Sequence, residues 1–197
     1  LPFEISVAES QYSNTDQIET EIQLADSGYG QGQVLVNPIH LASLYTMYPN
    51  RGKVLKPYLV YKDTPEPEVW IEDACSPETA EIVEDGMKAV ISSEHGTGHA
   101  AMRSDITLAG KTGTAEIKAS KEDTSGTELG WFAVYTADAD IQKPVLMVSM
   151  VEDVKNAGGS GLVVRKSRDV LGAYIPSGHS FANAISSSGY VVSPNLL

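Results

Sequence analysis

The stretch Leu108-Ala109-Gly110-Lys111-Thr112-Gly113-Thr114-Ala115-Glu116 decides the fold, because a short apolar run ends there in a lysine, two threonines and a glycine. An ammonium and hydroxyl groups can hold a carboxylate, and a glycine lets another backbone approach closely. Gly-Lys-Thr also occurs in phosphate-binding P-loops, which need a second glycine five residues earlier. Position 105 is an aspartate, so a cradle of backbone N–H groups for a nucleotide phosphate is not encoded.

This stretch resembles the Lys-Thr-Gly strand of the penicillin-binding proteins, the serine D,D-transpeptidases that crosslink peptidoglycan. Other segments follow in the order of that family's class B members, and their joint order is more specific than any single match. They are a Gly-rich turn and helix at 25–32 and 37–42, a Gly-Thr-Gly loop at 94–98, and strands at 130–133 and 151–154. The sequence at 24–32, 111–116 and 130–132 is closest to the low-affinity, β-lactam-resistance type. The matches cover about residues 1 to 172.

The resemblance implies an α/β (α+β) fold of the serine β-lactamase and transpeptidase type, with an antiparallel sheet flanked by helices. It implies catalytic roles for Lys111 and Thr114. It also implies that Lys111, Thr112, Gly113 and Thr114 bind the carboxylate of a D-Ala-D-Ala stem peptide or of a β-lactam. The backbone N–H of Thr114 would then supply one donor of the oxyanion hole.

The family's nucleophile is the serine of a Ser-x-x-Lys motif, and a Ser-x-Asn motif forms another wall of the cleft. This chain has no Ser-x-x-Lys and no Ser-x-Asn in a plausible context. We therefore expect the C-terminal part of a transpeptidase domain at 1–174, inactive alone and completed by an upstream half, in the same or a separate chain. Residues 175–197 do not resemble the family, and we expect a loose or disordered tail there.

Composition excludes several other classes of function. With 42% hydrophobic and 20% charged residues, the 197-residue chain is typical of a folded protein. The net charge of -12 argues against nucleic acid or an anionic membrane surface as a partner. Cys75 is the only cysteine, so it forms no internal disulfide. No apolar run approaches the roughly 20 residues of a membrane span. The resemblance implies the extracytoplasmic face of the cell membrane, through an anchor outside this chain.

Hydrophobic periodicity predicts the regular elements. One helix begins at Asn37-Pro38 and ends at 50–52, and a longer one runs from Ser76-Pro77 to Gly96 with Ala80, Val83, Met87 and Val90 on its apolar face. A strand is expected at 56–61, an antiparallel meander at 111–118, 130–136 and 145–151, and a surface loop at 10–21. A last helix at 163–174 has Val164, Val170, Leu171 and Tyr174 as its candidate apolar face.

Other kinds of site are less favoured by the sequence. His95 and His99 have the spacing of a helical metal pair, but Gly96-Thr97-Gly98 between them disfavours a helix, so we expect no metal site and no cofactor. The carboxylate pairs Asp138 with Asp140 and Glu152 with Asp153 are expected on solvated edges. Two alternative functions stay open, a β-lactam sensor domain and a binding-only module that has lost its nucleophile. The class B sequence at 28–41 favours the enzyme.

Overall fold

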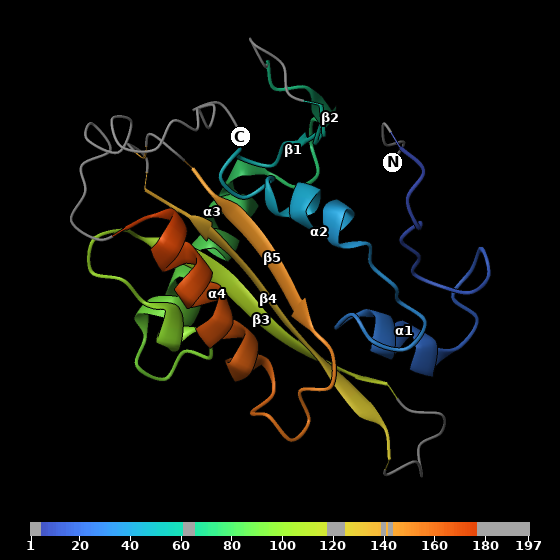
Figure 1. Ribbon diagram of the computed structural model, residues 1–197. Coiled ribbons are helices and arrows are strands. Elements are labelled where there is room, and N and C mark those ends of the chain that lie inside the picture. Colours follow the sequence, from blue (N-terminus) through green and yellow to red (C-terminus); the bar gives the residue numbers. More distant parts are fainter. Residues whose placement is uncertain (1–4, 61–65, 118–124, 139–140, 142–143, 177–197) are drawn as a thin grey trace.

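The computed structural model describes residues 5–60, 66–117, 125–138, 141 and 144–176. In chain order the elements are α1 (Glu21–Ser27), α2 (Pro38–Tyr45), β1 (Val54–Leu55), β2 (Val69–Ile71), α3 (Pro77–Ser92), a 3-10 turn η1 (His99–Ala101), β3 (Leu108–Ile117), β4 (Thr127–Thr136), β5 (Leu146–Val151) and α4 (Ser160–Tyr174). Strands β3, β4 and β5 form an antiparallel sheet, with α4 across one face and α2 beside β5 (Figure 1). This confirms the predicted meander and the α+β fold.

Alternate residues of the strands point to opposite faces of the sheet, and the face under α4 carries the larger core. Phe132 and Val134 of β4 are fully buried there. The other buried members of that cluster are Ile91, Ala101, Leu108, Val154, Val163, Val164 and Leu171. Ser167 of α4 donates a hydrogen bond to Ser149 of β5 at 3.0 Å, which ties the helix to the sheet.

Among the described residues, the hydrophobic cluster on the opposite face lies at one end of the sheet. Tyr135 is buried there with Ala109 and with Met87 of α3, and the rings of Tyr45 and Tyr48 pack against them. Burial and the nearby Glu84 carboxylate, which accepts the Tyr135 hydroxyl at 3.1 Å, raise the pKa of Tyr135 above its usual range. The helix α2 thus closes the end of the sheet where β3 begins and β4 ends.

Helix α3 begins where the sequence predicts. Ser76 caps it by accepting the N–H of Thr79 at 3.2 Å, and Pro77 occupies the first turn. Ala80, Met87 and Ile91 are its buried residues. The expected Val83 is 37% exposed, so the apolar face lies slightly to one side of the predicted one.

Several details differ from the sequence-based expectations. Helix α2 ends at Tyr45 instead of at 50–52, with turns at 46–52, and helix α3 ends at Ser92, ahead of Gly96. The predicted strand at 56–61 is wrong for residues 56–60; the strand before them is Val54–Leu55, paired with Val69–Ile71, and Pro57 has no N–H to extend the ladder. Helix α1 follows the expected loop, although none of its residues is buried. On α4, Val170 and Tyr174 are 57% and 50% exposed, while Val163 and Ser167 are buried instead.

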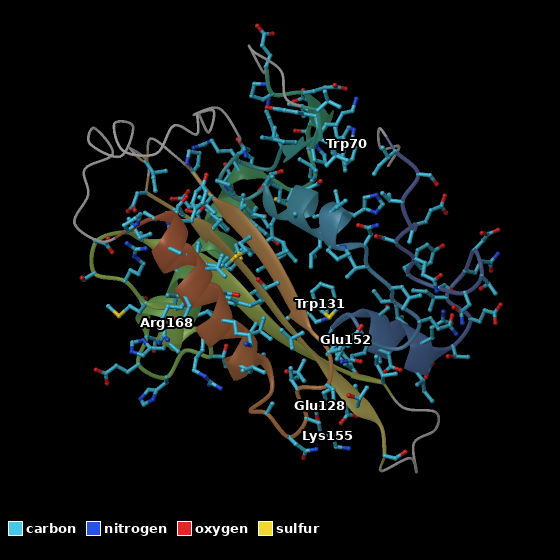
Figure 2. The ribbon with its side chains drawn as sticks, in the orientation of Figure 1. Trp70, Glu128, Trp131, Glu152, Lys155 and Arg168 are labelled. Carbon is cyan, nitrogen blue, oxygen red and sulfur yellow. The ribbon has the colours of Figure 1, made fainter. Side chains whose placement is uncertain are left out.

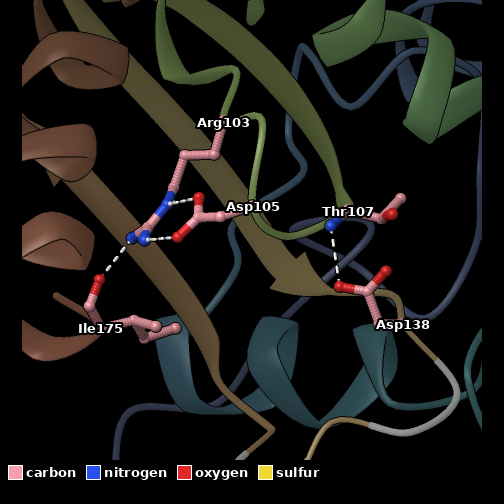
Figure 3. A network of polar contacts seen from close by, with 5 residues as sticks. All are labelled: Arg103, Asp105, Thr107, Asp138 and Ile175. Carbon is pink, nitrogen blue, oxygen red and sulfur yellow. Dashed lines mark hydrogen bonds and ion pairs between the residues drawn. The ribbon is translucent and has the colours of Figure 1, made fainter. Parts of the chain in front are cut away.

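The end of α4 is fixed by a polar network around Arg103 (Figure 3). The Arg103 guanidinium donates to both carboxylate oxygens of Asp105 and to the carbonyl oxygen of Ile175 at 2.6 Å. Ile175 is 3% exposed, so the first residue of the expected tail belongs to the folded part. Residues 177–197 of that tail lie outside the described residues.

Candidate active site

The residues singled out in the sequence lie in the middle of β3. Lys111 and Thr114 are exposed, Gly113 is half-buried and Thr112 is 7% exposed. Their side chains alternate, so Thr112 and Thr114 point to the α4 side and Lys111 to the other. The Lys111 ammonium nevertheless donates to the carbonyl oxygen of Thr112 at 2.6 Å. It therefore reaches the outer edge of β3, beside the backbone of the threonines.

Along β3, the backbone N–H and C=O groups of successive residues point alternately toward β4 and away from it. In an antiparallel pair the N–H and C=O of one residue point to the same side. The carbonyl of Thr114 accepts a hydrogen bond from the Gln31 amide at 3.3 Å, and that of Thr112 accepts Lys111, so both residues point away from β4. Their N–H groups consequently point outward as well. This edge can donate two N–H bonds to an extended backbone or an oxyanion.

Gln31 lies within the Gly-rich turn after α1, and that turn brings the N-terminal segment to the edge of β3. Gly30 and Gly32 have positive φ angles of 79° and 70°, a conformation that favours glycine. The N–H of Gln31 donates to the Asp26 carbonyl at 2.9 Å, which closes the turn. The structure thus joins two segments that are 83 residues apart.

A second turn lies beside Thr114. Gly158 and Gly159 have positive φ angles of 97° and 59°, and a Cβ added to Gly159 would lie 4.0 Å from the Thr114 hydroxyl. Gly130 sits opposite Thr114 in the ladder, and a Cβ there would lie 2.7 Å from Val163. Glycine at 130 therefore lets the first turn of α4 approach the sheet at the level of Thr114.

One contact at the site was missed in the sequence. The hydroxyl oxygen of Thr97, in the loop before η1, lies 2.7 Å from the hydroxyl oxygen of Thr112. Thr97 is exposed, in contrast to its partner. The Gly-Thr-Gly pattern had marked the loop as leading into β3, but nothing in it indicated a side-chain contact 15 residues along the chain.

Asp138, Asp153 and His99, three of the other polar candidates, have structural partners. Asp138 accepts the Thr107 N–H at 2.7 Å (Figure 3), and Asp153 accepts the Thr127 hydroxyl at 2.9 Å. His99 lies in η1, and its ring contacts the Ile91 carbonyl at 3.0 Å. Among the described residues no three His, Cys, Asp or Glu side chains gather as metal ligands, and no helix is long and apolar enough to cross a membrane. Asp140 lies outside the described residues.

Comparison with known proteins identifies the family to which the chain belongs. The family model of the penicillin binding protein transpeptidase domain matches residues 3–171, so the chain belongs to that family. It is 40% identical over 168 residues to penicillin-binding protein 3 of Bacillus subtilis and 32% identical over 164 residues to the peptidoglycan D,D-transpeptidase MrdA of Haemophilus influenzae. These alignments cover 85% and 75% of this chain, but only 25% of each relative.

Solved structures give the same fold. The TP domain of Burkholderia pseudomallei penicillin-binding protein 3 superposes with a TM-score of 0.67 at 21% identity, over 90% of this chain and 54% of that one. PBPA from Mycobacterium tuberculosis gives 0.66 at 22% identity, over 86% of this chain and 38% of that one. The chain therefore represents about half of one such domain and about a quarter of the full-length relatives. The resemblance stated from the sequence is confirmed at the level of family and fold.

Proposed function

We propose that this chain forms one wall of the active site of a serine-type peptidoglycan D,D-transpeptidase, and that the outer edge of β3 is that wall. The observation that carries the proposal is the convergence of the Lys111 ammonium with the outward-facing backbone of Thr112 and Thr114. The family supports it, as does the relative named a peptidoglycan D,D-transpeptidase.

In this proposal a serine outside this chain attacks a carbonyl carbon of the D-Ala-D-Ala stem peptide. The serine oxygen forms an ester with that carbon, the peptide C–N bond breaks, and the proton lost by the serine hydroxyl goes to the amine nitrogen of the departing D-Ala. An amine of a second stem peptide then attacks the acyl ester and restores the serine. A β-lactam acylates the same serine by opening its ring.

Each residue of the strand has a role in this reaction. Lys111 places positive charge near the nucleophile and the substrate carboxylate, and the hydroxyls of Thr112 and Thr114 hydrogen-bond that carboxylate. The N–H of Thr114 donates to the oxyanion that develops on the attacked carbonyl. Gly113 adds no side chain between the two threonines, which leaves the edge accessible to the substrate backbone.

We further infer that an upstream half of the same domain covers the open part of the sheet and carries the serine. Trp131, labelled in Figure 2, lies on the face opposite α4, beyond the end that α2 closes. Met150 is its partner in the β4–β5 ladder and is 38% exposed. In the described part of the chain no strand pairs with the outer edge of β5. An apolar face and a bare strand edge of this kind favour association with further chain.

Two finer assignments extend the proposal. The segments at 24–32, 111–116 and 130–132 support the low-affinity, β-lactam-resistance type of class B enzyme. The family supports a position at the extracytoplasmic face of the cell membrane, through an anchor outside this chain.

The test compares the chain alone with the same chain completed by its upstream half, each treated with a fluorescent penicillin. We expect a covalent adduct on an upstream serine of the completed domain and none on the chain alone, because only the former has the nucleophile. Intact mass and peptide mapping locate the adduct. An adduct on the isolated chain at its active-site face, or none on the well-folded completed domain, would contradict the proposal.

The chain alone is also expected to self-associate through the open part of the sheet. A monomer with a cooperative melt would show that it needs no complement.

A further inference from the structure

The contact between Thr97 and Thr112 joins hydroxyls of different exposure. Thr112 is 7% exposed, whereas Thr97 is exposed on the loop between α3 and η1. Their oxygens are 2.7 Å apart, the usual distance of a hydrogen bond between hydroxyls. Either hydroxyl can donate, so this contact alone leaves the direction open.

The loop around Thr97 is held by contacts on both sides. A Cβ on Gly96 would lie 2.1 Å from the Val90 carbonyl oxygen, so only glycine fits there. The N–H of Gly98 donates to the same carbonyl at 3.0 Å. Because a carbonyl only accepts, the His99 ring donates from Nδ1 to the Ile91 carbonyl at 3.0 Å. Backbone and ring together anchor the loop to the end of α3, which fixes Thr97 beside β3.

A hydroxyl has one proton, and this decides what Thr112 can bind. If Thr112 donates to Thr97, it can offer a ligand only lone pairs, which repel a carboxylate. If Thr97 donates to Thr112, the proton of Thr112 is available for a carboxylate, which only accepts. Hydrogen bonds in such a chain also polarise and strengthen one another.

We propose that Thr97 is a positioning residue that donates to Thr112 and so presents the Thr112 proton to the substrate carboxylate. The proposal rests on the proposed function, because it needs a carboxylate at the outer edge of β3. It assigns to the Gly96-Thr97-Gly98 loop a part in recognising the free carboxylate, through Thr112 rather than by direct contact.

The test uses the completed domain and two probes, a penicillin with its free carboxylate and the methyl ester of the same penicillin. Thr97→Val removes the hydroxyl at nearly constant shape. We expect it to lower the acylation rate constant for the free acid about fivefold to tenfold, as for one hydrogen bond between neutral groups, and to change that for the ester less than about twofold. Thr97→Ser should restore the parent rate for the acid. Ser92→Ala, an exposed hydroxyl at the end of α3, is the matched control and should change neither rate.

A double-mutant cycle separates action through Thr112 from direct contact. In a Thr112→Val background, Thr97→Val should cost nothing further, because there is no hydroxyl left to orient. An equal loss for acid and ester, no loss for either, or additive losses in the cycle would each overturn the proposal. If Thr97→Val does not fold, Thr97→Ala takes its place. Failure of the parent domain to acylate would contradict the proposed function instead, so the failure of either proposal can be recognised separately.

Discussion

The two faces of the three-stranded sheet are built from alternate residues of the same strands, yet they differ in how they are covered. Under α4, Phe132 and Val134 are fully buried, and Gly130 lets the helix approach closely. On the other face, α2 and α3 cover Tyr135 at one end, while Met150 at the other end stays partly exposed.

This difference separates stability from function within one sheet. The face under α4 buries its apolar side chains against other described residues, so the stability that this burial provides comes from contacts within this chain. The outer edge of β3 holds the polar groups of the proposed site, which Lys111 reaches from the open face and Thr112 and Thr114 from the α4 side. Substitutions on the first side should therefore change folding, and those at the edge should change reaction rates in a protein that still folds.

The largest effect is expected in the α4 core. Phe132→Ala removes a fully buried ring and leaves a cavity, which costs about 3 to 5 kcal/mol in such sites. Denaturant unfolding of the completed domain measures the loss of unfolding free energy. Met150→Ala is the comparison on the open face. If the upstream half covers Met150, that substitution should cost about 2 kcal/mol or more; a cost near zero would mean that the face stays exposed.

The sequence predicted the elements whose signals are local. Ser76 and Pro77 located the start of α3, and apolar residues located β3, β4 and β5, because caps and periodicity act over a few residues. Helix α1 was missed, since none of its residues is buried and it has no apolar face to detect. On α4 the buried Ser167 was not counted as part of the inner face, so the predicted face was rotated toward Val170.

For the proposed site, the sequence indicated the strand but not the contacts around it. Residues 111–114 were singled out because the order of several segments along the chain resembles the family. The contact of Gln31 with Thr114, and that of Thr97 with Thr112, could not be derived from spacing. Both join segments that become neighbours only once the helices pack on the sheet.

At the β3 edge the largest effect should come from Lys111. Lys111→Ala removes one preorganised positive charge from an exposed position, so the completed domain should fold normally and acylate about 10² to 10³ times more slowly, or roughly 3 to 4 kcal/mol of barrier. Lys166→Ala, an exposed lysine of α4 away from the edge, is the matched control and should keep the parent rate. Acylation within about threefold of the parent with an unchanged melting temperature would remove Lys111 from the site.

Thr114→Val tests a smaller part of the same edge. It loses a hydroxyl contact to the carboxylate but keeps the backbone N–H proposed as oxyanion donor, so its penalty should be smaller, about tenfold. Part of the loss should be in substrate affinity, because the carboxylate is present before and during the reaction. Separate measurement of the acylation rate and of the dissociation constant divides the two. A loss as large as that of Lys111→Ala would mean that the backbone of β3 has moved.

The smallest effect concerns the ion pair that holds the end of α4. The Arg103 guanidinium beside Asp105 holds the pKa of that carboxyl below its usual range. A carboxyl with a lowered pKa in the folded state stabilises the fold above its unfolded pKa of about 4, and the contribution is lost as pH falls through the folded value. Melting temperatures measured from pH 6 down to pH 2 should therefore fall less steeply in Arg103→Gln, which also starts a few degrees lower, since the bond to the Ile175 carbonyl is weakened. Arg168→Gln breaks the exposed pair with Asp169 and should leave the pH profile of the parent unchanged. If Arg103→Gln followed the parent curve throughout the acid range, the ion pair with Asp105 would contribute nothing to the closed side of the sheet, and the α4 core alone would hold the helix in place.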